Sequence, residues 1–348
     1  MQFSPAGGCG CKLGPGQLSE VLSVFLEGLA DGAQPVPKTD DRLIVGLPER
    51  DDAAVYVVAD DLAIILTADF FTPIDDDARR WGAIAAANAM SDVYAMGGTP
   101  RLAVNLVEWP DEVLPMGLLA EVLRGAESVT RRAGAHVVGG HTLRGAAPKF
   151  GMAVVGFVAP DAVLRISAAS PGDRLILTKP LGTGLVSTGL KNGLAPDHVV
   201  TASYRSMVDL NDRASQVCVR YGVRAATDVT GFGLLGHLQE MCLASDVSAT
   251  LTVRDIPVLP GVEELVHQGM TPGGAIRNWD HFGSLSRGRA LTDVERAVIS
   301  DPQTSGGLLL AAAEDLVDVV LSALTEQGVA GRVIGSLTHR SDVAIELR

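Results

Sequence analysis

Alternation of apolar and polar residues predicts a β-hairpin early in the chain. The segments AAVYVV (53–58) and LAIILTAD (62–69) are rich in β-branched residues and are separated by the turn ADD. The alanine-rich segment 81–98 follows and ends in two glycines, which is typical of a helix with a glycine C-cap. The same reading predicts strands at 101–109, 136–140 and 149–158, and a long helix at 115–135.

A segment with little periodicity, 158–174, divides the chain into two units. It contains Pro160, Pro171 and small polar residues, which indicate a linker. The second unit runs from RLILTKPLGTG to DVAIELR and again mixes strands with helices. Because neither unit alternates strands and helices strictly, α+β fits better than a doubly wound sheet. We therefore expect a flexible Gly-rich catalytic arm at 1–16, an N-terminal domain at 17–160 and a C-terminal α+β domain at 161–348.

Length and charge narrow the class of protein. The chain has 348 residues, which favours two domains, and its net charge is -13. That charge argues against binding to nucleic acid or to an anionic membrane, because neutralising phosphates requires clustered lysine and arginine. An acidic excess suits a protein that collects divalent cations, although from charge alone plain solubility is the better explanation. No apolar segment has the length of a signal peptide or a membrane span, so we expect a cytoplasmic protein without membrane or nucleic-acid partners.

Two cysteines and a lysine, Cys9, Cys11 and Lys12, lie among glycines at the start of the chain. They could form a metal-binding pair, a redox pair or a reactive arm over a site built elsewhere. Zinc is weakly indicated, since no second Cys or His pair lies nearby, and a disulfide across one residue would be strained. The other two cysteines, Cys218 and Cys242, fall in amphipathic stretches and are expected to be core residues.

Aspartates recur at the ends of apolar stretches, where local propensity does not explain them. They are Asp51, Asp52, Asp69, Asp92 and Asp228. Asn88 and Asp92 are four residues apart, so they share one helix face, and amide and carboxylate oxygens are ligands that Mg²⁺ accepts. Any one of these acids could instead be a turn residue, a helix cap or part of a solvated face. Together they favour hard-cation binding and phosphate chemistry.

Several glycine loops could bind phosphate through backbone N–H groups, and none is a Walker A loop. The loops are VVGGHT, KPLGTGLVSTG, DVTGFGLLGH and DPQTSGG. GFGLLG matches GxGxxG, and Asp255 lies at the spacing of a ribose-binding acid, which makes a dinucleotide site the main rival. The preceding residues, ATDVT, are not the apolar first strand that such a fold requires. His141 follows Gly139-Gly140 and could contact a nucleotide or could simply be a packed histidine.

Taken together, these motifs resemble one family along essentially the whole chain. GGCGCK, ERDDAAVY, TADFF, AANAMSDVYAMGG, VVGGHT, LTKPLGTG, TDVTGFGLLGH and DPQTSGG occur in the order seen in selenophosphate synthetases (selenide, water dikinases). That family is similar to aminoimidazole ribonucleotide synthetase. The resemblance implies two α+β domains and a homodimer whose N-terminal sheets together form a barrel.

The resemblance also implies a reaction and its residues. ATP, selenide and water would give selenophosphate, AMP and phosphate, with selenophosphate as selenium donor for selenocysteine and selenonucleoside synthesis. By position, Cys9 and Lys12 match the catalytic pair, and Asp52, Asp92 and Asp228 match the acids that bind more than one Mg²⁺ ion. The matches to nucleotide contacts are Lys12, Glu49, Arg50, Asp51, Asp69, Asp92, Gly139, Gly140 and His141. The family often has Thr where this chain has Glu49 and Ala68, so the ATP contacts there are open.

Two other interpretations remain open at this point. One is a second enzyme of the same fold group acting on another small substrate, which would have no use for the CxC-K arm. The other is a catalytically silent ATP- or metal-binding protein, which loss of Cys9 or of the acids would have favoured. On the first interpretation, Lys12 would offset phosphate charge and favour the Cys9 thiolate, while flanking glycines permit closure.

Overall fold

The computed structural model describes residues 40–348 and eleven residues before them. Those eleven are Met1, Gly7, Gly8, Gly10, Gly14, Gly16, Gln17, Glu20, Val21, Val24 and Phe25. Cys9, Cys11 and Lys12 therefore lie outside the described residues.

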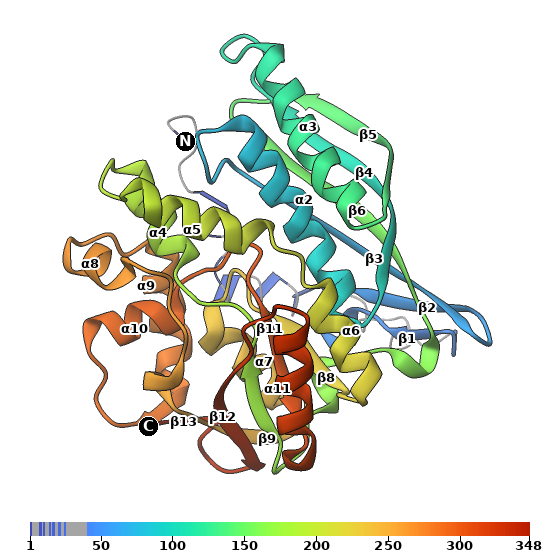
Figure 1. Cartoon of the computed structure of the whole chain (residues 1–348), viewed down its shortest axis with the longest axis vertical. Coiled ribbons are helices and arrows are strands. Elements are labelled where there is room, and N and C mark those ends of the chain that lie inside the picture. The colour runs from blue at the N-terminus through green and yellow to red at the C-terminus, as the bar shows by residue number, and fades with distance from the viewer. Residues whose placement is uncertain are drawn as a thin grey trace.

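The first unit is a six-stranded sheet with two helices on one face (Figure 1). Its elements are β1 (Leu43–Val45), β2 (Ala54–Ala59), β3 (Leu62–Phe71), α2 (Ala78–Ala95), β4 (Thr99–Trp109), α3 (Met116–Arg132), β5 (His136–Arg144) and β6 (Lys149–Val158). The strand order is β1-β2-β3-β6-β4-β5, and every neighbouring pair is antiparallel except β4 with β5. The hairpin, strands and helices expected here are confirmed, and α2 begins a few residues earlier than the sequence predicted.

Helix α2 is buried along almost its whole length, because it packs on α3, on the sheet and on the second unit. Its N-cap, Asp77, accepts hydrogen bonds from the backbone N–H groups of Arg79 and Arg80. Gly82 and Gly125 allow close approach to α3, since a Cβ on either would overlap backbone of the facing helix. The alanine-rich sequence thus serves a helix with neighbours on several sides rather than an amphipathic surface helix.

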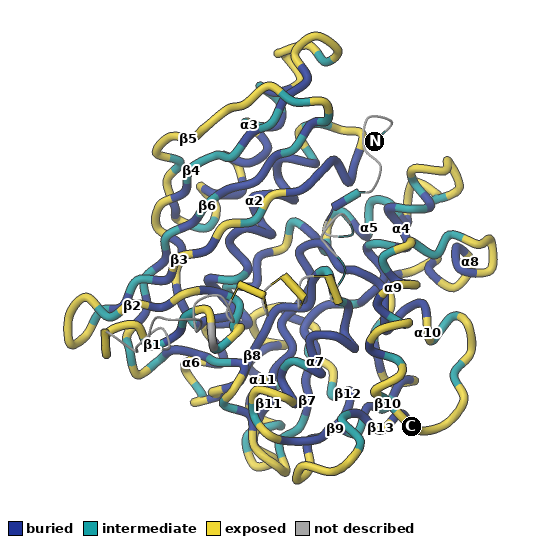
Figure 2. The backbone as a smooth tube through the Cα atoms, turned by 180° about the vertical axis from the view of Figure 1, so that it is seen from behind, coloured by how far each residue is buried: buried dark blue, intermediate teal, exposed yellow. Residues whose placement is uncertain are grey.

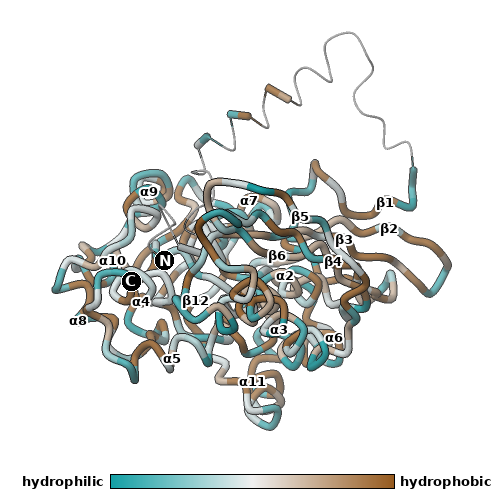
Figure 3. The backbone as a smooth tube through the Cα atoms, turned by 90° about the horizontal axis from the view of Figure 1, so that it is seen from above, coloured by the Kyte–Doolittle hydropathy of each residue, from teal (hydrophilic) through white to brown (hydrophobic). Residues whose placement is uncertain are grey.

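The opposite face of this sheet carries exposed apolar side chains. Burial alternates along β3, with Thr67 and Phe71 buried and Leu66 and Phe70 more than half exposed. Figure 2 shows exposed backbone along β5, and Figure 3 shows that β2 and β3 are largely hydrophobic. One face of the sheet is therefore core, and no described part of the chain covers the apolar side chains on the other face.

The second unit holds a seven-stranded mixed sheet with helices around it (Figure 1). Its strands are β7 (Arg174–Leu177), β8 (Ala225–Asp228), β9 (Val247–Leu251), β10 (Ser286–Gly288), β11 (Leu308–Ala312), β12 (Arg332–His339) and β13 (Ile345–Leu347). Its helices are α4 (Thr183–Lys191), α5 (Asp197–Val208), α6 (Asp212–Tyr221), α7 (Gly233–Ala244), α8 (Val262–His267), α9 (Gly273–Phe282), α10 (Asp293–Ser300) and α11 (Val317–Glu326). The order is β10-β13-β9-β12-β7-β11-β8, and the α+β prediction is confirmed.

Cys218 on α6 and Cys242 on α7 are buried, as predicted, and burial raises the pKa of each thiol to about 12. They are structural side chains without thiolate character. Within the described part of the chain, no helix is both long enough and apolar enough to cross a membrane.

Polar side chains join α2 to the second unit. Asn211 Nδ2 donates to Ser91 Oγ at 2.9 Å, and Ser215 Oγ donates to the carbonyl of Tyr94 at 2.7 Å. Ser91 and the Tyr94 carbonyl of α2 thus bind side chains of the second unit.

Candidate active site

A cavity of about 680 Å³ opens where the first sheet meets the second unit. Five predicted carboxylates line it: Asp51, Asp52, Asp69, Asp92 and Asp228. They come from four separate parts of the chain, and only the tertiary fold brings them together. Arg50, also predicted, lines the same cavity.

Each carboxylate lies at a point fixed by local structure. Asp52 lies just before β2, and Asp69 is on β3 on the same face as Thr67. Asp92 lies in the last turn of α2, and Asp228 is the final residue of the fully buried strand β8. The expectation that Asn88 and Asp92 share a helix face holds, since both point toward β3.

Neutral donors hold these acids in place. Thr67 Oγ1 donates to Asp92 Oδ2, and Thr227 Oγ1 donates to Asp52 Oδ1 at 3.0 Å. Asn88 Nδ2 donates to Asp69 Oδ2 at 2.5 Å. The sequence reasoning missed both threonines; the signal was present, since Thr67 is two residues before Asp69 and Thr227 directly precedes Asp228.

Burial raises the pKa of two of these carboxyl groups, Asp52 and Asp51. Burial, followed by the charges of Asp228, Asp51 and Asp92, raises the pKa of Asp52 well above its ordinary value, against the Thr227 hydrogen bond. Burial raises the pKa of Asp51 to about 6, although the N–H groups of Asp52 and Ile166 oppose the shift. The site therefore concentrates negative charge that a cation would relieve.

The acids fit a metal bound jointly with a ligand better than a closed metal site. Asp52 Oδ2 is buried with no hydrogen-bond partner among the described residues. Within that same part of the chain, no three His, Cys, Asp or Glu side chains already form a group that could hold a metal ion alone. Mg²⁺ is usually held by one or two carboxylates together with substrate phosphates, which agrees with acids spread around a cavity.

Comparison with known proteins gives the family. The family model for the N-terminal domain of AIR synthase related protein matches residues 50–158, and that for its C-terminal domain matches 170–348. A selenide, water dikinase of Pseudomonas straminea is 44% identical over 341 residues, covering 96% of this chain and 92% of that protein. One of Carboxydothermus hydrogenoformans is 41% identical, covering 97% and 95%. The chain belongs to the selenide, water dikinase family. The resemblance stated from the motifs is confirmed.

Solved structures with the same fold are more distant from this selenide, water dikinase family member. Hydrogenase maturation protein HypE in complex with ATP has a TM-score of 0.66 at 20% identity, covering 92% of this chain and 91% of that one. A thiamine-monophosphate kinase from Stenotrophomonas maltophilia has a TM-score of 0.67 at 18% identity, covering 89% and 92%. At these identities the likeness shows the fold alone.

Four predicted nucleotide contacts lie away from the cavity lining. Glu49 Oε2 accepts a hydrogen bond from Gly46 N at 2.8 Å in the turn before β2. Gly139, Gly140 and His141 are exposed on the edge strand β5, three strand positions from β3, which corresponds to about 14 Å. Within one chain the three β5 residues and Asp69 do not share a site.

The catalytic pair predicted for this family member, Cys9 and Lys12, lies outside the described residues, but a neighbouring residue is placed. Gly8 N donates to the carbonyl of Thr72, just beyond β3, at 3.2 Å. Gly8 has a φ of +56°, and a Cβ there would overlap the Thr304 hydroxyl and lie 2.5 Å from Ile74 Cδ1. Gly8 thus lies against both units at once.

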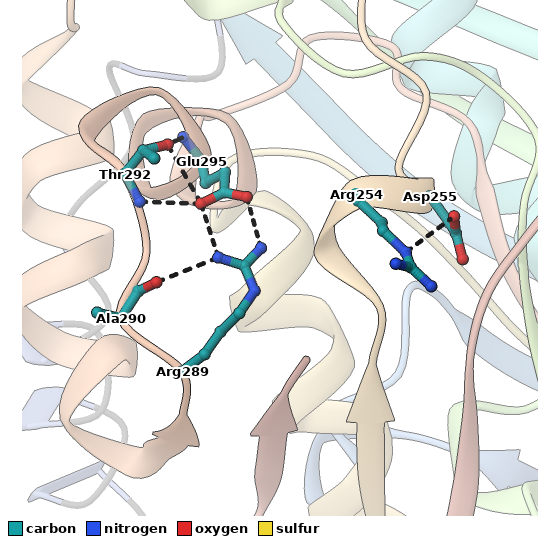
Figure 4. Close-up of polar contacts among 6 residues, drawn as sticks. All are labelled: Arg254, Asp255, Arg289, Ala290, Thr292 and Glu295. Carbon is teal, nitrogen blue, oxygen red and sulfur yellow. Dashed lines mark hydrogen bonds and ion pairs between the residues drawn. The ribbon is translucent and has the colours of Figure 1, made fainter.

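The rival dinucleotide motif is part of a different architecture in this selenide, water dikinase family member. The residues before GFGLLG do form a buried strand, β8, contrary to the sequence argument against one. However, among the described residues β8 is an edge strand paired only with β11, antiparallel, and it has no parallel partner there across α7 as a dinucleotide fold would require. Asp255 pairs instead with its neighbour Arg254, Nε to Oδ1 at 3.9 Å (Figure 4).

Proposed function

We propose that this protein uses ATP to phosphorylate selenide, giving selenophosphate, AMP and phosphate. The observation that carries the proposal is 44% identity over 96% of the chain to a selenide, water dikinase, together with a carboxylate-lined cavity at the junction of the two units. Two P–O bonds of ATP break in this reaction, and one phosphoryl group goes to selenide and the other to water. Selenophosphate would serve as selenium donor for selenocysteine and selenonucleoside synthesis.

Asp52, Asp92 and Asp228 are the proposed ligands of more than one Mg²⁺ ion. The buried, partnerless oxygen of Asp52 and the raised pKa of that carboxyl support this assignment. Bound Mg²⁺ would neutralise charge on the transferred phosphoryl oxygens. The chain's own contribution is orientation: Thr67 holds Asp92, and Thr227 holds Asp52.

The nucleotide contacts proposed within one chain are Arg50, Asp51, Asp69 and Asp92, which line the cavity. Gly139, Gly140 and His141 are proposed contacts that a second copy would have to complete, since β5 lies at the far edge of the sheet. Glu49 is a proposed contact from the turn before β2, next to the cavity-lining Arg50. The exposed apolar face supports a homodimer whose N-terminal sheets pack together as a barrel.

The arm, proposed as residues 1–16, would supply Lys12 to offset phosphate charge and Cys9 to meet selenide. It would act beside an N-terminal ATP- and metal-binding domain at 17–160 and a C-terminal domain at 161–348. The contact of Gly8 with Thr72 supports a placement of the middle of the arm, next to Cys9 in sequence, near the end of β3. We further propose that the protein is cytoplasmic.

The test is a nucleotide assay with ATP and Mg²⁺, run with and without selenide. Chromatography follows AMP, and phosphorus NMR follows selenophosphate. We expect both products only with selenide, and Cys9→Ser is expected to keep ATP binding while losing this turnover, because oxygen is the less ionised nucleophile at neutral pH. AMP or ADP formation that does not respond to selenide would favour a different substrate. ATP binding with no turnover at all would favour a silent binding protein.

A further inference from the structure

A buried lysine outside the carboxylate cavity is connected to it by a chain of hydrogen bonds. Lys179 follows β7 and is only 6% exposed. Its Nζ donates to the carbonyl oxygens of Asp209, at 2.7 Å, and Ser305, at 3.1 Å. Among the described residues it forms no ion pair with a carboxylate.

The burial of the Lys179 ammonium group requires a physical explanation. Burial lowers the pKa of Lys179 to about 8, and the more distant carboxylates of Asp209, Asp228 and Asp212 oppose the shift. A buried charge is costly unless it is hydrogen-bonded, and an apolar side chain of similar size would fill the same space more cheaply. We therefore attribute the presence of a lysine here to its hydrogen bonds with the carbonyls of Asp209 and Ser305.

The Ser305 carbonyl belongs to a loop in an unusual conformation. Ser305 is a non-glycine residue at φ +51° and is 2% exposed. Left-handed backbone is disfavoured for serine, so contacts around it must hold it there. Lys179 Nζ donates to the carbonyl of Ser305, and the backbone N–H of Ser305 donates to Asn88 Oδ1 at 2.8 Å.

That N–H fixes the orientation of the Asn88 amide. Because the Asn88 oxygen must accept from Ser305 N, its NH₂ group must face Asp69, and it donates to Asp69 Oδ2. If the Asn88 amide were reversed, its NH₂ group would face the Ser305 N–H and its oxygen would face the Asp69 carboxylate, and neither contact would be a hydrogen bond. The carboxylate of Asp69 in the first unit is thus oriented through backbone held in the second.

We propose that Lys179 is a positioning residue that orients Asp69 for the nucleotide through Ser305 and Asn88. The proposal rests on the proposed role of Asp69 as an ATP contact. This chain of hydrogen bonds links the two units. Without the lysine, the Ser305 carbonyl loses the hydrogen bond that helps to hold its backbone conformation. The Ser305 N–H then no longer fixes the Asn88 amide, and the amide no longer fixes the orientation of Asp69.

A double-mutant cycle with Lys179→Met and Asn88→Ala tests this. The readout is the affinity for a non-hydrolysable ATP analogue with Mg²⁺, measured by calorimetry on the full chain, beside KM for ATP and kcat for AMP formation. We expect each single variant to weaken analogue binding about tenfold. The double variant should be no weaker than the worse single one, because both changes break the same chain of contacts.

A lysine that only stabilises the fold would give a different pattern. Losses that multiply to about a hundredfold in the double variant, or Lys179→Met binding within twofold of wild type, would overturn the proposal. Lys149→Met is the matched control, since Lys149 pairs with Glu108 at 2.7 Å away from the cavity, and it should bind as wild type does. If Lys179→Met does not fold, Lys179→Gln replaces it in the cycle, since it removes the charge and keeps an N–H donor.

The two proposals fail separately. If wild-type protein binds the ATP analogue but makes no selenophosphate, the proposed reaction is contradicted, while the double-mutant cycle can still be measured through analogue affinity. Wild-type protein that makes selenophosphate while the cycle is multiplicative contradicts only the role of Lys179.

Discussion

The two sheets of this protein differ in how they are covered. In the second unit, every residue of β8 and β11 is buried, and β11 (LLLAA) is a continuous apolar run. In the first unit, β3 alternates, and its uncovered face carries Leu66 and Phe70. The difference teaches that these strands of the second sheet are fully covered within one chain, whereas the first sheet has one face that packs on α2 and lines the cavity and one apolar face that is exposed. The carboxylates gather on the inner side, where the two sheets meet.

The largest effect is expected at that meeting point. Asp52→Asn replaces a carboxylate whose Oδ2 is buried without a hydrogen-bond partner in the described part of the chain, so the Mg²⁺ site proposed above would lose a ligand. We expect turnover to fall about a thousandfold, equivalent to about 4 kcal/mol, while the apo protein melts no lower than wild type, because carboxylate repulsion is relieved. Asp60→Asn, in the exposed hairpin turn, is the control and should keep full turnover. Full activity of Asp52→Asn at limiting Mg²⁺ would refute the metal assignment.

The next effect is a pH dependence of the free energy of unfolding, and it arises from Asp51 in the carboxylate cluster. The pKa of Asp51 rises from 3.8 to about 6 on folding. Its protonated form is thus favoured in the folded state, and this contribution is complete below about pH 4 and lost as pH rises through about 6. With a chelator present, the free energy of unfolding of Asp51→Asn relative to wild type should grow by up to about 3 kcal/mol from pH 4 to 7. Denaturant melts at both pH values measure it; a constant difference would contradict the assigned pKa.

The outer face of the first sheet gives the third effect. Phe70 is 53% exposed, and Phe70→Glu would place a charge on an apolar face that a second copy is proposed to cover. We expect the dimer dissociation constant to rise about a hundredfold, roughly 2.7 kcal/mol, as measured by sedimentation at micromolar concentration. Val319→Glu, on α11 of the second unit and 39% exposed, should leave the assembly unchanged. A wild-type monomer with full activity would remove the basis for the barrel.

The smallest effect tests whether the arm is held between the two units at Gly8. Gly8→Ala would overlap Thr304 and strain a φ of +56°, so we expect turnover to fall about tenfold, or about 1.4 kcal/mol, with an unchanged melting temperature. In Gly14→Ala, the nearest described atom to the new Cβ would be Gln17 Oε1 at 3.6 Å, and turnover should change by less than twofold. Equal turnover in the two variants would show that the contact of Gly8 with Thr72 does not matter in solution.

Local pattern was sufficient for the elements and for the types of residue that carry chemistry. β-branched runs predicted β2 and β3, and the glycine pair at Gly97-Gly98 marked the end of α2. The aspartates stood out because Asp is a poor choice for strand ends and helix interiors. Ordered motifs then identified the family, since a match along the whole chain is more specific than any one loop.

Only the tertiary structure decided which of those residues meet. Sequence spacing cannot show that Asp52, Asp92 and Asp228 line one cavity, because their approach depends on strand order and on how α2 packs against the second unit. It likewise could not separate Gly139 and His141 from Asp69, which strand order alone sets apart. The sequence determined the secondary structure and the family through short-range propensity and ordered motifs. The fold decided the charge cluster, the role of Thr227 and the link from Lys179 to Asp69, because burial and long-range hydrogen bonds exist only once both units are packed together.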